Sequence, residues 1–204
     1  MPHLYLCKVS VFIPLQLRFR NYIVTIISHL RYGGTMTQTQ PVLKTQTTEL
    51  PTENGLLDGE KLKAAAIVKS ALADTFTLLV ATQGLHWNVQ GPMFYSIHKL
   101  TEEQYRDMFE AVDEIAERVR SLGFPAPHSA EEITQHSSLV SPKDQDELDV
   151  QIQTLIQGNE RIARSLRHAL PEIEAMSDVK TADLFTTRIG VHEENAWMLR
   201  AIVS

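Results

Sequence analysis

Five side chains in the centre of the sequence have the types and the spacing of ligands to a transition metal. Two are imidazoles and three are carboxylates, and all lie between positions 86 and 117: His86, His98, Glu102, Asp113 and Glu117. Imidazole with carboxylate is a ligand set that suits iron, zinc or manganese. Because one histidine on a helix is more often packed or solvent-exposed than bound to a metal, the spacing of all five has to support the assignment.

Four of the five share one stripe of a helix if residues 94–122 are helical. At about 100° per residue, the three carboxylates lie about 40°, 60° and 100° around the axis from His98. In chain order they are Glu102, Asp113 and Glu117. This stripe borders the apolar face of the helix, where a carboxylate costs free energy unless something pairs with it. The pattern therefore predicts a bound cation rather than an ordinary solvated face.

Distance then decides where the ligands meet. His86 precedes a turn and His98 follows it, so an antiparallel hairpin brings both imidazoles to one end, with Glu102 one turn further in. His98 and Asp113 are 15 residues apart, or about 22 Å along a helix, and cannot ligate one ion within one chain. A second copy across a two-fold axis would bring its own Asp113 and Glu117 to face the histidine end. The sequence predicts sites shared between subunits.

A conventional di-iron bundle is a different arrangement and does not fit. Such bundles use Glu-x-x-His pairs within one chain. None of the eight histidines has Glu three residues before it; they stand at positions 3, 29, 86, 98, 128, 136, 168 and 192.

The hydrophobic pattern that must position these ligands is helical almost throughout. A period of about 3.6 residues predicts four long helices and one short one: Glu60–Val89, Phe94–Leu122, Ser129–Ser137, 142–170 and Lys180–Val203. Leu62, Val80 and Phe109 are among the apolar positions, with Phe109 expected on a buried face, and Pro171 is expected to close the third long helix. No segment predicts a strand. The predicted fold class is all-α, a four-helix bundle with a short extra helix between the second and third long helices.

Composition divides the chain into three parts. Residues 1–35 hold four basic residues and no acidic one, and their two apolar runs fall short of the roughly 20 residues that cross a bilayer. Met36 is one candidate for the true start, and a targeting or membrane-surface segment is the other interpretation of the extension. Residues 36–58 predict a flexible tail, rich in Thr and Gln, and residues 59–204 predict the bundle domain.

The overall composition excludes several classes of protein. A chain of 204 residues with 43% hydrophobic residues can bury a core and is not disordered overall. The single cysteine, Cys7, excludes a disulfide scaffold and a cysteine zinc finger and favours a reducing cytoplasm. No transmembrane segment is expected. Beyond the extension, 15 basic and 25 acidic residues give a balance of −10, which disfavours polyanion binding and favours cations.

The ligand residues also carry a resemblance to a known family. The first two helices resemble the signature of the Dps family, the starvation-induced mini-ferritins, in His86-Trp87-Asn88-Val89, Gly91, Phe94, His98, Asp113, Glu117-Arg118 and Leu122-Gly123. The last helix is similar to that family's last helix in His192-Glu193, Trp197-Met198 and Arg200. The resemblance covers about residues 56–203.

The resemblance implies a ferritin-like bundle that assembles as a hollow homo-dodecamer with ferroxidase sites at two-fold interfaces. It puts His86, His98, Asp113 and Glu117 on the family's iron ligands. The family commonly has Asp where this chain has Glu102, whose longer reach would let it either bridge the two irons or bind a second, weaker iron differently. The family's chemistry implies two irons per site, oxidised from Fe(II) preferably by hydrogen peroxide and more slowly by dioxygen, and stored as ferric mineral.

Two further expectations each keep an alternative. Glu174, Asp178 and Asp183 lie near the junction of the last two helices, where the resemblance puts three-fold pores, and an acidic ring would draw cations inward. The alternative is a solvated helix start that Asp178 caps. Trp87, beside the first histidine, would serve either as a local sink for oxidation or as a packing residue.

Three functions compete. The first is an iron-oxidising and iron-storing protein that protects the cell from oxidative damage. The second is a DNA-binding protein that condenses the nucleoid, for which family members typically use a Lys-rich tail; here residues 36–58 hold one lysine against three acidic residues. The third is a metal-free bundle, for which the five spaced ligands would be coincidence. We expect iron oxidation, with only weak DNA binding unless the basic extension is retained.

Overall fold

The computed structural model describes residues 49–143 and 146–204, and the extension 1–35 lies outside them. This part of the chain contains no strand, and its helices follow in the order α1 (Asp58–Asn88), α2 (Phe94–Ser121), α3 (Ala130–Gln135), α4 (Leu148–Ala175) and α5 (Val179–Ile202). The predicted all-α class, with a short helix between the second and third long ones, is confirmed.

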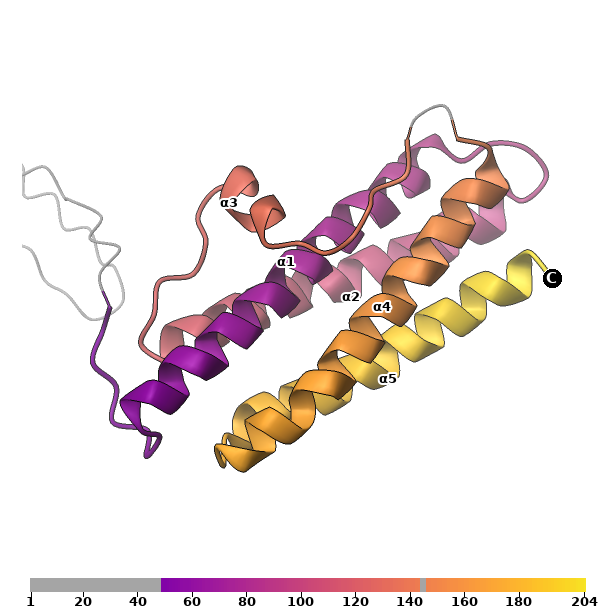
Figure 1. The fold of residues 1–204 in the computed structure, drawn as a ribbon. Coiled ribbons are helices and arrows are strands. Elements are labelled where there is room, and N and C mark those ends of the chain that lie inside the picture. The colour runs from indigo at the N-terminus through magenta and orange to yellow at the C-terminus, as the bar shows by residue number, and fades with distance from the viewer. Residues whose placement is uncertain (1–48, 144–145) are drawn as a thin grey trace, which may run out of the picture. The chain divides into compact units, whose positions relative to one another are not determined.

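The four long helices form an antiparallel bundle of two hairpins (Figure 1). α1 packs on α2 and α4 packs on α5, while α1 also contacts α4 and α2 contacts α5. The long connection after α2 returns along α1, where the buried Asp74 carboxylate accepts hydrogen bonds of 2.6–2.9 Å from Ser137 and Ser138. α4 therefore runs antiparallel to α1, and Lys63 near the start of α1 pairs with Glu172 near the end of α4.

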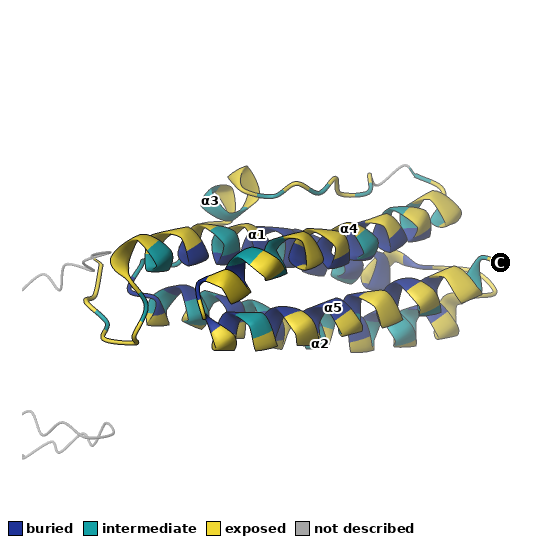
Figure 2. Ribbon diagram, turned by 60° about the horizontal axis from the view of Figure 1, so that its bottom comes forward, coloured by how far each residue is buried: buried dark blue, intermediate teal, exposed yellow. Residues whose placement is uncertain are grey.

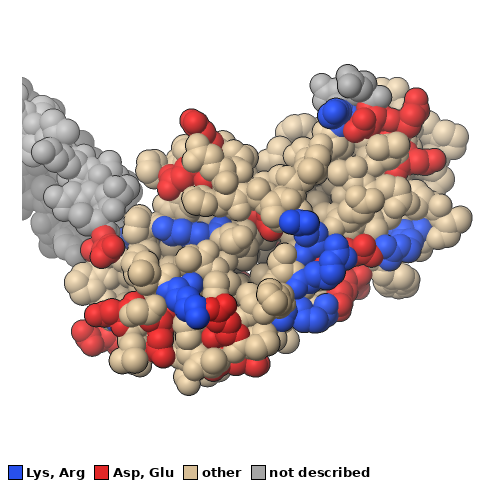
Figure 3. Space-filling view, viewed as in Figure 1, with Lys and Arg blue, Asp and Glu red and all other residues tan. Residues whose placement is uncertain are grey.

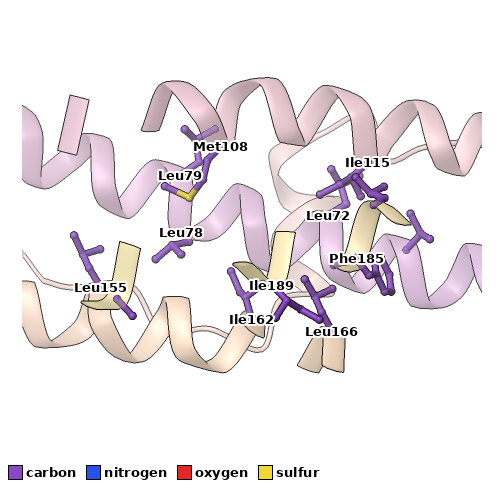
Figure 4. Packing of buried hydrophobic residues seen from close by; sticks show 14 of the residues in the cluster. Leu72, Leu78, Leu79, Met108, Ile115, Leu155, Ile162, Leu166, Phe185 and Ile189 are labelled. Atoms are coloured by element: carbon purple, nitrogen blue, oxygen red, sulfur yellow. The ribbon is translucent and has the colours of Figure 1, made fainter. Parts of the chain in front are cut away.

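The core lies between the layer of α1 and α4 and the layer of α2 and α5 (Figure 2). Fully buried aliphatic and aromatic side chains from all four helices fill it (Figure 4), among them Leu72, Ile115, Leu155, Ile162 and Phe185. Each such side chain contributes about 1.5–3 kcal/mol by leaving water. Gly158 of α4 lets this helix approach α1 closely, since a Cβ there would meet the Leu78 side chain at 2.8 Å.

Core packing also explains why α1 is so apolar. By length and composition alone it could cross a membrane, with a mean hydropathy of 1.6 in its most apolar window, and it is the one such helix among the residues described. The core helix of a globular protein passes the same test, and 56% of that window is buried within the bundle.

The third long helix differs from the prediction at both ends. It begins at Leu148 rather than at 142, because Lys143 and Asp146 form a turn and the backbone of Glu147 is extended. Pro171 lies inside the helix, which continues to Ala175. Proline removes one backbone N–H, but Pro171 is exposed and the turn after it is anchored by a fully buried isoleucine. Burial of that next turn outweighs one lost hydrogen bond.

Part of the predicted flexible tail packs on the bundle. Residues 49–57 lie against the end of α2, where the Leu50 N–H donates to the Gly123 carbonyl at 2.8 Å. Gly123 has φ 101°, and a Cβ there would lie 2.8 Å from the Leu50 oxygen, so this contact requires glycine. Lys61 also donates to the Thr52 carbonyl at 2.7 Å. Positions 36–48 of the predicted tail lie outside the described residues.

Candidate metal centre

Two histidines bind each other's backbone at the turn between α1 and α2. His86 lies in the last turn of α1 and is 8% exposed, and His98 lies in the second turn of α2. Their rings stack with centroids 3.9 Å apart. Nδ1 of His86 lies 2.8 Å from the backbone oxygen of His98, and Nδ1 of His98 lies 2.9 Å from the backbone oxygen of His86. The sequence prediction that the hairpin joins these imidazoles is met.

This reciprocal pairing fixes the tautomer of both rings. A backbone carbonyl can only accept a hydrogen bond, so each Nδ1 must carry the hydrogen, and in a neutral imidazole the lone pair is then on Nε2. Neither Nε2 makes a hydrogen bond to a described residue. Histidines that bind metals commonly donate their other N–H in this way, because it fixes the ring's orientation. On each neutral ring, the nitrogen left for a metal is therefore Nε2.

Aromatic rings and a glycine hold the histidine pair in place. Phe94 stacks on His98 and Tyr105 meets His86 edge-on, each with ring centroids 5.0 Å apart. Gly91 has φ 90°, which glycine adopts without strain, and its carbonyl accepts the Phe94 N–H at 3.0 Å. The turn residues thus set the distance between the two imidazoles.

Glu102 lies one turn beyond His98, and its carboxylate is held by two cations of α2. Lys99 Nζ lies 2.8 Å from Oε2, and the Arg106 guanidinium lies 2.6 Å from Oε1. The hydrogen bond from Lys99 lowers the pKa of the Glu102 carboxyl, partial burial opposes this, and the charge of Arg106 lowers the pKa further. Glu102 is therefore an ionised carboxylate that its own helix neutralises.

Asp113 and Glu117 are exposed on α2, and neither makes an ion pair or a side-chain hydrogen bond with a described residue. Because α2 is one continuous helix, Asp113 is about 22 Å along the axis from His98. Accordingly, no three His, Cys, Asp or Glu side chains within the described part of one chain lie close enough together to hold a metal ion. The structure joins the two histidines, while Glu102 points to its cations and the two exposed carboxylates stand apart.

The surface beside these ligands is apolar as well as charged. Phe109, which the sequence pattern puts on a buried face, is 69% exposed. It lies on the ligand stripe, about 20° around the axis from His98, but in a part of the stripe that no described helix covers. Trp87 and Tyr95 are 69% and 70% exposed, so packing within one subunit does not account for Trp87. Leu62 and Val80 of α1 are also exposed, but Leu62 lies about 36 Å along α1 from His86. Exposed large apolar side chains next to the ligands, such as Phe109 and Trp87, are typical of interaction surfaces.

Asp178 does not belong to an open acidic ring. It is 3% exposed and caps α5 by accepting hydrogen bonds from the backbone N–H and the hydroxyl of Thr181, at 3.0 and 2.6 Å. Arg118 of α2 donates to it at 2.6 Å. Burial alone raises the pKa of the Asp178 carboxyl, but the bonds from Arg118 and Thr181 outweigh it and lower the pKa. The capping alternative is the one observed, whereas Glu174 and Asp183 are exposed and remain predictions.

His192 lies in the core and is not a ligand candidate of this site. It is fully buried, and its Nδ1 lies 2.9 Å from Oδ1 of Asn159, whose amide nitrogen donates to the Leu155 carbonyl. Burial, reinforced by the charge of Arg188, lowers the pKa of His192 to about 3. This imidazole is therefore neutral at physiological pH.

Positive charge is gathered on another face, over α4 and α5 (Figure 3). A surface pocket of about 330 Å³ there is lined by Arg164, Arg167 and Arg200 together with two glutamates and Trp197. Glu193 pairs with Arg167, and Glu160 pairs with the other two arginines. Because its arginines are already paired, this patch has little charge left to bind phosphate.

Sequence reasoning missed the roles of three basic residues on α2. Lys99 and Arg106 lie three residues before and four residues after Glu102, the spacings at which helical side chains meet, so the signal was available. Arg118 is part of the family signature, but its contact with Asp178 joins positions 60 residues apart. No local pattern could show that contact.

The chain is similar to proteins with a ferritin-like domain. Residues 65–204 match a family model described as a ferritin-like domain. An uncharacterised low temperature-induced protein of Nostoc is 38% identical over 151 residues, which cover 73% of this chain and 84% of that protein. The DNA protection during starvation protein of Agrobacterium fabrum is 29% identical to this chain, and the matched region covers 74% of this chain and 94% of that protein.

Solved structures show the same fold. The DPS protein of Vibrio cholerae O1, described as a member of a broad superfamily of ferritin-like diiron-carboxylate proteins, is 28% identical with a TM-score of 0.70, covering 75% of this chain and 97% of its own. DpsC of Streptomyces coelicolor has a TM-score of 0.74 at 24% identity and covers 78% and 93% of the two chains.

Proposed function

Because the chain belongs to the ferritin-like superfamily, and within it to the Dps family, we propose that it is a ferroxidase that stores iron. In this proposal it binds two Fe(II) at each site between two subunits, oxidises them and keeps the ferric product as mineral in a homo-dodecameric shell. Relatives are named for DNA protection during starvation and described as diiron-carboxylate proteins. The cytoplasm is the expected compartment.

The observation that carries the proposal is the reciprocal histidine pair. Two stacked rings, each donating Nδ1–H to the other's backbone, leave two Nε2 lone pairs for Fe(II). Neither of these Nε2 atoms is among the fully buried polar atoms without a partner, whereas Nε2 of the core residue His192 is, so the paired histidines are open to an incoming ion and His192 is not. Here the two Nε2 atoms find no partner among the described residues.

The second half of each site would come from another subunit. Asp113 and Glu117 are exposed and have no cation partner among the described residues of their own chain. The exposed Phe109 and Trp87 lie beside the ligands, and a two-fold contact would cover them while each subunit gives its carboxylates to its neighbour's histidines. One such contact makes two equivalent sites.

Two irons at one site suit a two-electron oxidant. Hydrogen peroxide takes two electrons and two protons to become two waters, and each Fe(II) supplies one electron in becoming Fe(III). Paired reduction avoids the one-electron step that releases hydroxyl radical, which links iron oxidation to the protection of DNA. Peroxide is therefore the proposed oxidant, with dioxygen slower. Trp87, exposed beside His86, is either a sink for stray oxidation or part of the subunit contact.

DNA binding is the second candidate function, supported by the names of the relatives. The arginines of the α4–α5 patch are paired with glutamates, and the residues after position 35 carry a balance of −10. Binding through phosphate neutralisation would therefore be weak. We propose that the protein protects DNA chiefly by removing Fe(II) and peroxide.

Mixed shells test the shared site. Each of the homomeric variants His98→Ala and Glu117→Ala should oxidise Fe(II) with peroxide at least about tenfold more slowly, since losing even a supporting contact of a ligand costs that much. Glu103→Ala, an exposed acid on α2 that lies off the ligand stripe, is the matched control and should keep the wild-type rate in stopped-flow absorbance.

Shells assembled from both variants give the decisive result. In a dimer with one subunit of each kind, one site combines both defects and the other has neither. Each mixed dimer should therefore recover up to about half of the wild-type activity. If all ligands came from one chain, every site would carry one defect, and a lack of recovery in demonstrably mixed dimers would refute the shared site.

A further inference from the structure

Glu102 is the one predicted carboxylate ligand that its own chain already neutralises. Both of its oxygens are occupied, one by Lys99 at 2.8 Å and the other by Arg106 at 2.6 Å. The exposed carboxylates Asp113 and Glu117 have no such partner among the described residues. With its oxygens turned to these cations, Glu102 does not form a three-ligand group with His86 and His98.

We propose that Lys99 and Arg106 form a cation clamp on Glu102 that sets how tightly each site binds its second Fe(II), an inference that rests on the proposed ferroxidase function. Because Lys99 and Arg106 each hold one oxygen, a metal ion that binds both oxygens of Glu102 has to displace both cations, and one that binds a single oxygen competes with the cation already there. The Lys99 and Arg106 side chains are 52% and 68% exposed, so they can swing into water when the metal arrives. The clamp would make the Glu102 subsite fill after the subsite that uses the unpaired carboxylates.

The charge of the site gives the direction of the effect. In the proposed shared site, Glu102 and the partner's two carboxylates carry −3, and Lys99 and Arg106 bring this to −1. A divalent cation is attracted less strongly by the smaller negative charge. Removing the two cations should therefore tighten the binding of the second metal, and salt should reduce the difference because the clamp is partly exposed.

A purely structural role for the two cations is the competing explanation. Pairs at these spacings stabilise a helix slightly, and this effect would change the melting temperature of the metal-free protein without changing its metal affinity. Metal affinity and metal-free melting therefore separate the two explanations. Lys63, which pairs with Glu172 at the other end of α1, offers a matched lysine about 34 Å along that helix from His86.

Calorimetric titration of the assembled full-length protein with Co(II), which keeps its oxidation state in air, tests the clamp. The double variant Lys99→Met with Arg106→Met should bind the second Co(II) per site about tenfold more tightly at low salt, because each exposed ion pair is worth up to about fivefold. The first Co(II) should gain less than the second, because its carboxylates are not the ones that Lys99 and Arg106 hold. Lys63→Met should change neither step, and adding Glu102→Gln should abolish the gain.

The outcomes separate the clamp from the ferroxidase proposal. If the double variant binds the second Co(II) no more tightly than wild type, while His98→Ala still removes Co(II) binding, the clamp is refuted and the ferroxidase proposal stands. A lower melting temperature with unchanged affinity refutes it equally, in favour of the structural role. If wild-type protein shows no Co(II) binding that depends on His98, both proposals fail together.

Discussion

Replacing Asp178 by alanine should destabilise the bundle rather than slow the entry of cations. The side chain is 2% exposed, caps α5 and balances the charge of Arg118, whose own side chain is 12% exposed. Removing one partner of a buried ion pair costs about 3–5 kcal/mol, because the other charge is left buried and unpaired. Loss of the cap overlaps with this cost and is worth about 1 kcal/mol alone. We therefore expect Asp178→Ala to lower the free energy of unfolding by about 3–5 kcal/mol.

Urea unfolding followed by circular dichroism at pH 7 and fixed protein concentration measures this loss. Asp183→Ala is the matched control, since that carboxylate is 71% exposed and lies 3.7 Å from Lys180; exposed pairs are worth about 1 kcal/mol or less. Combining Asp178→Asn with Arg118→Met should recover much of the stability, because no charge is left unpaired.

The pH dependence of this stabilisation follows from the lowered pKa of Asp178. Its contribution to stability is complete above the usual carboxyl pKa and is lost as the pH falls through the lowered value. If Asp178→Ala and wild type unfold at the same urea concentration, while the variant takes up iron more slowly, the assignment of Asp178 to the cap is wrong and the pore prediction regains its third member.

Two further predictions concern the core histidine and DNA. Because the pKa of His192 is lowered to about 3, the unfolded chain binds a proton below about pH 6.5 that the folded chain does not. The free energy of unfolding should therefore fall by about 1.4 kcal/mol for each pH unit of acidification. In urea titrations between pH 6.5 and 5, His192→Leu should remove this contribution, whereas the control His168→Leu, at an exposed histidine, should keep it. The form that starts at Met36 should bind duplex DNA only weakly in gel-shift assays at physiological salt. Tight, salt-sensitive binding would contradict the inference that its net negative charge disfavours DNA.

Sequence periodicity determined most of the fold. Four long apolar stripes with a helical period, separated by glycine and proline, can bury their apolar faces only against one another, and the bundle followed. The same reasoning failed at Pro171, because a local rule about proline does not register the burial of the turn after it. It also failed at Phe109, whose position is apolar by pattern but lies on a part of the ligand stripe that the described helices leave open.

The candidate site divides in the same way. Residue types and spacing alone predicted that His86 and His98 meet at a hairpin and that Asp113 lies too far along its helix to join them, because helix rise and rotation are fixed by the backbone. Only the tertiary structure decided the exchange of Nδ1 bonds between the two histidines, the pairing of the α5 cap Asp178 with Arg118, and the position of the Glu102 carboxylate. These depend on which polar group is nearest in space once the helices have packed, and a buried or half-buried charge takes the partner that geometry offers it, however far away in sequence that partner lies.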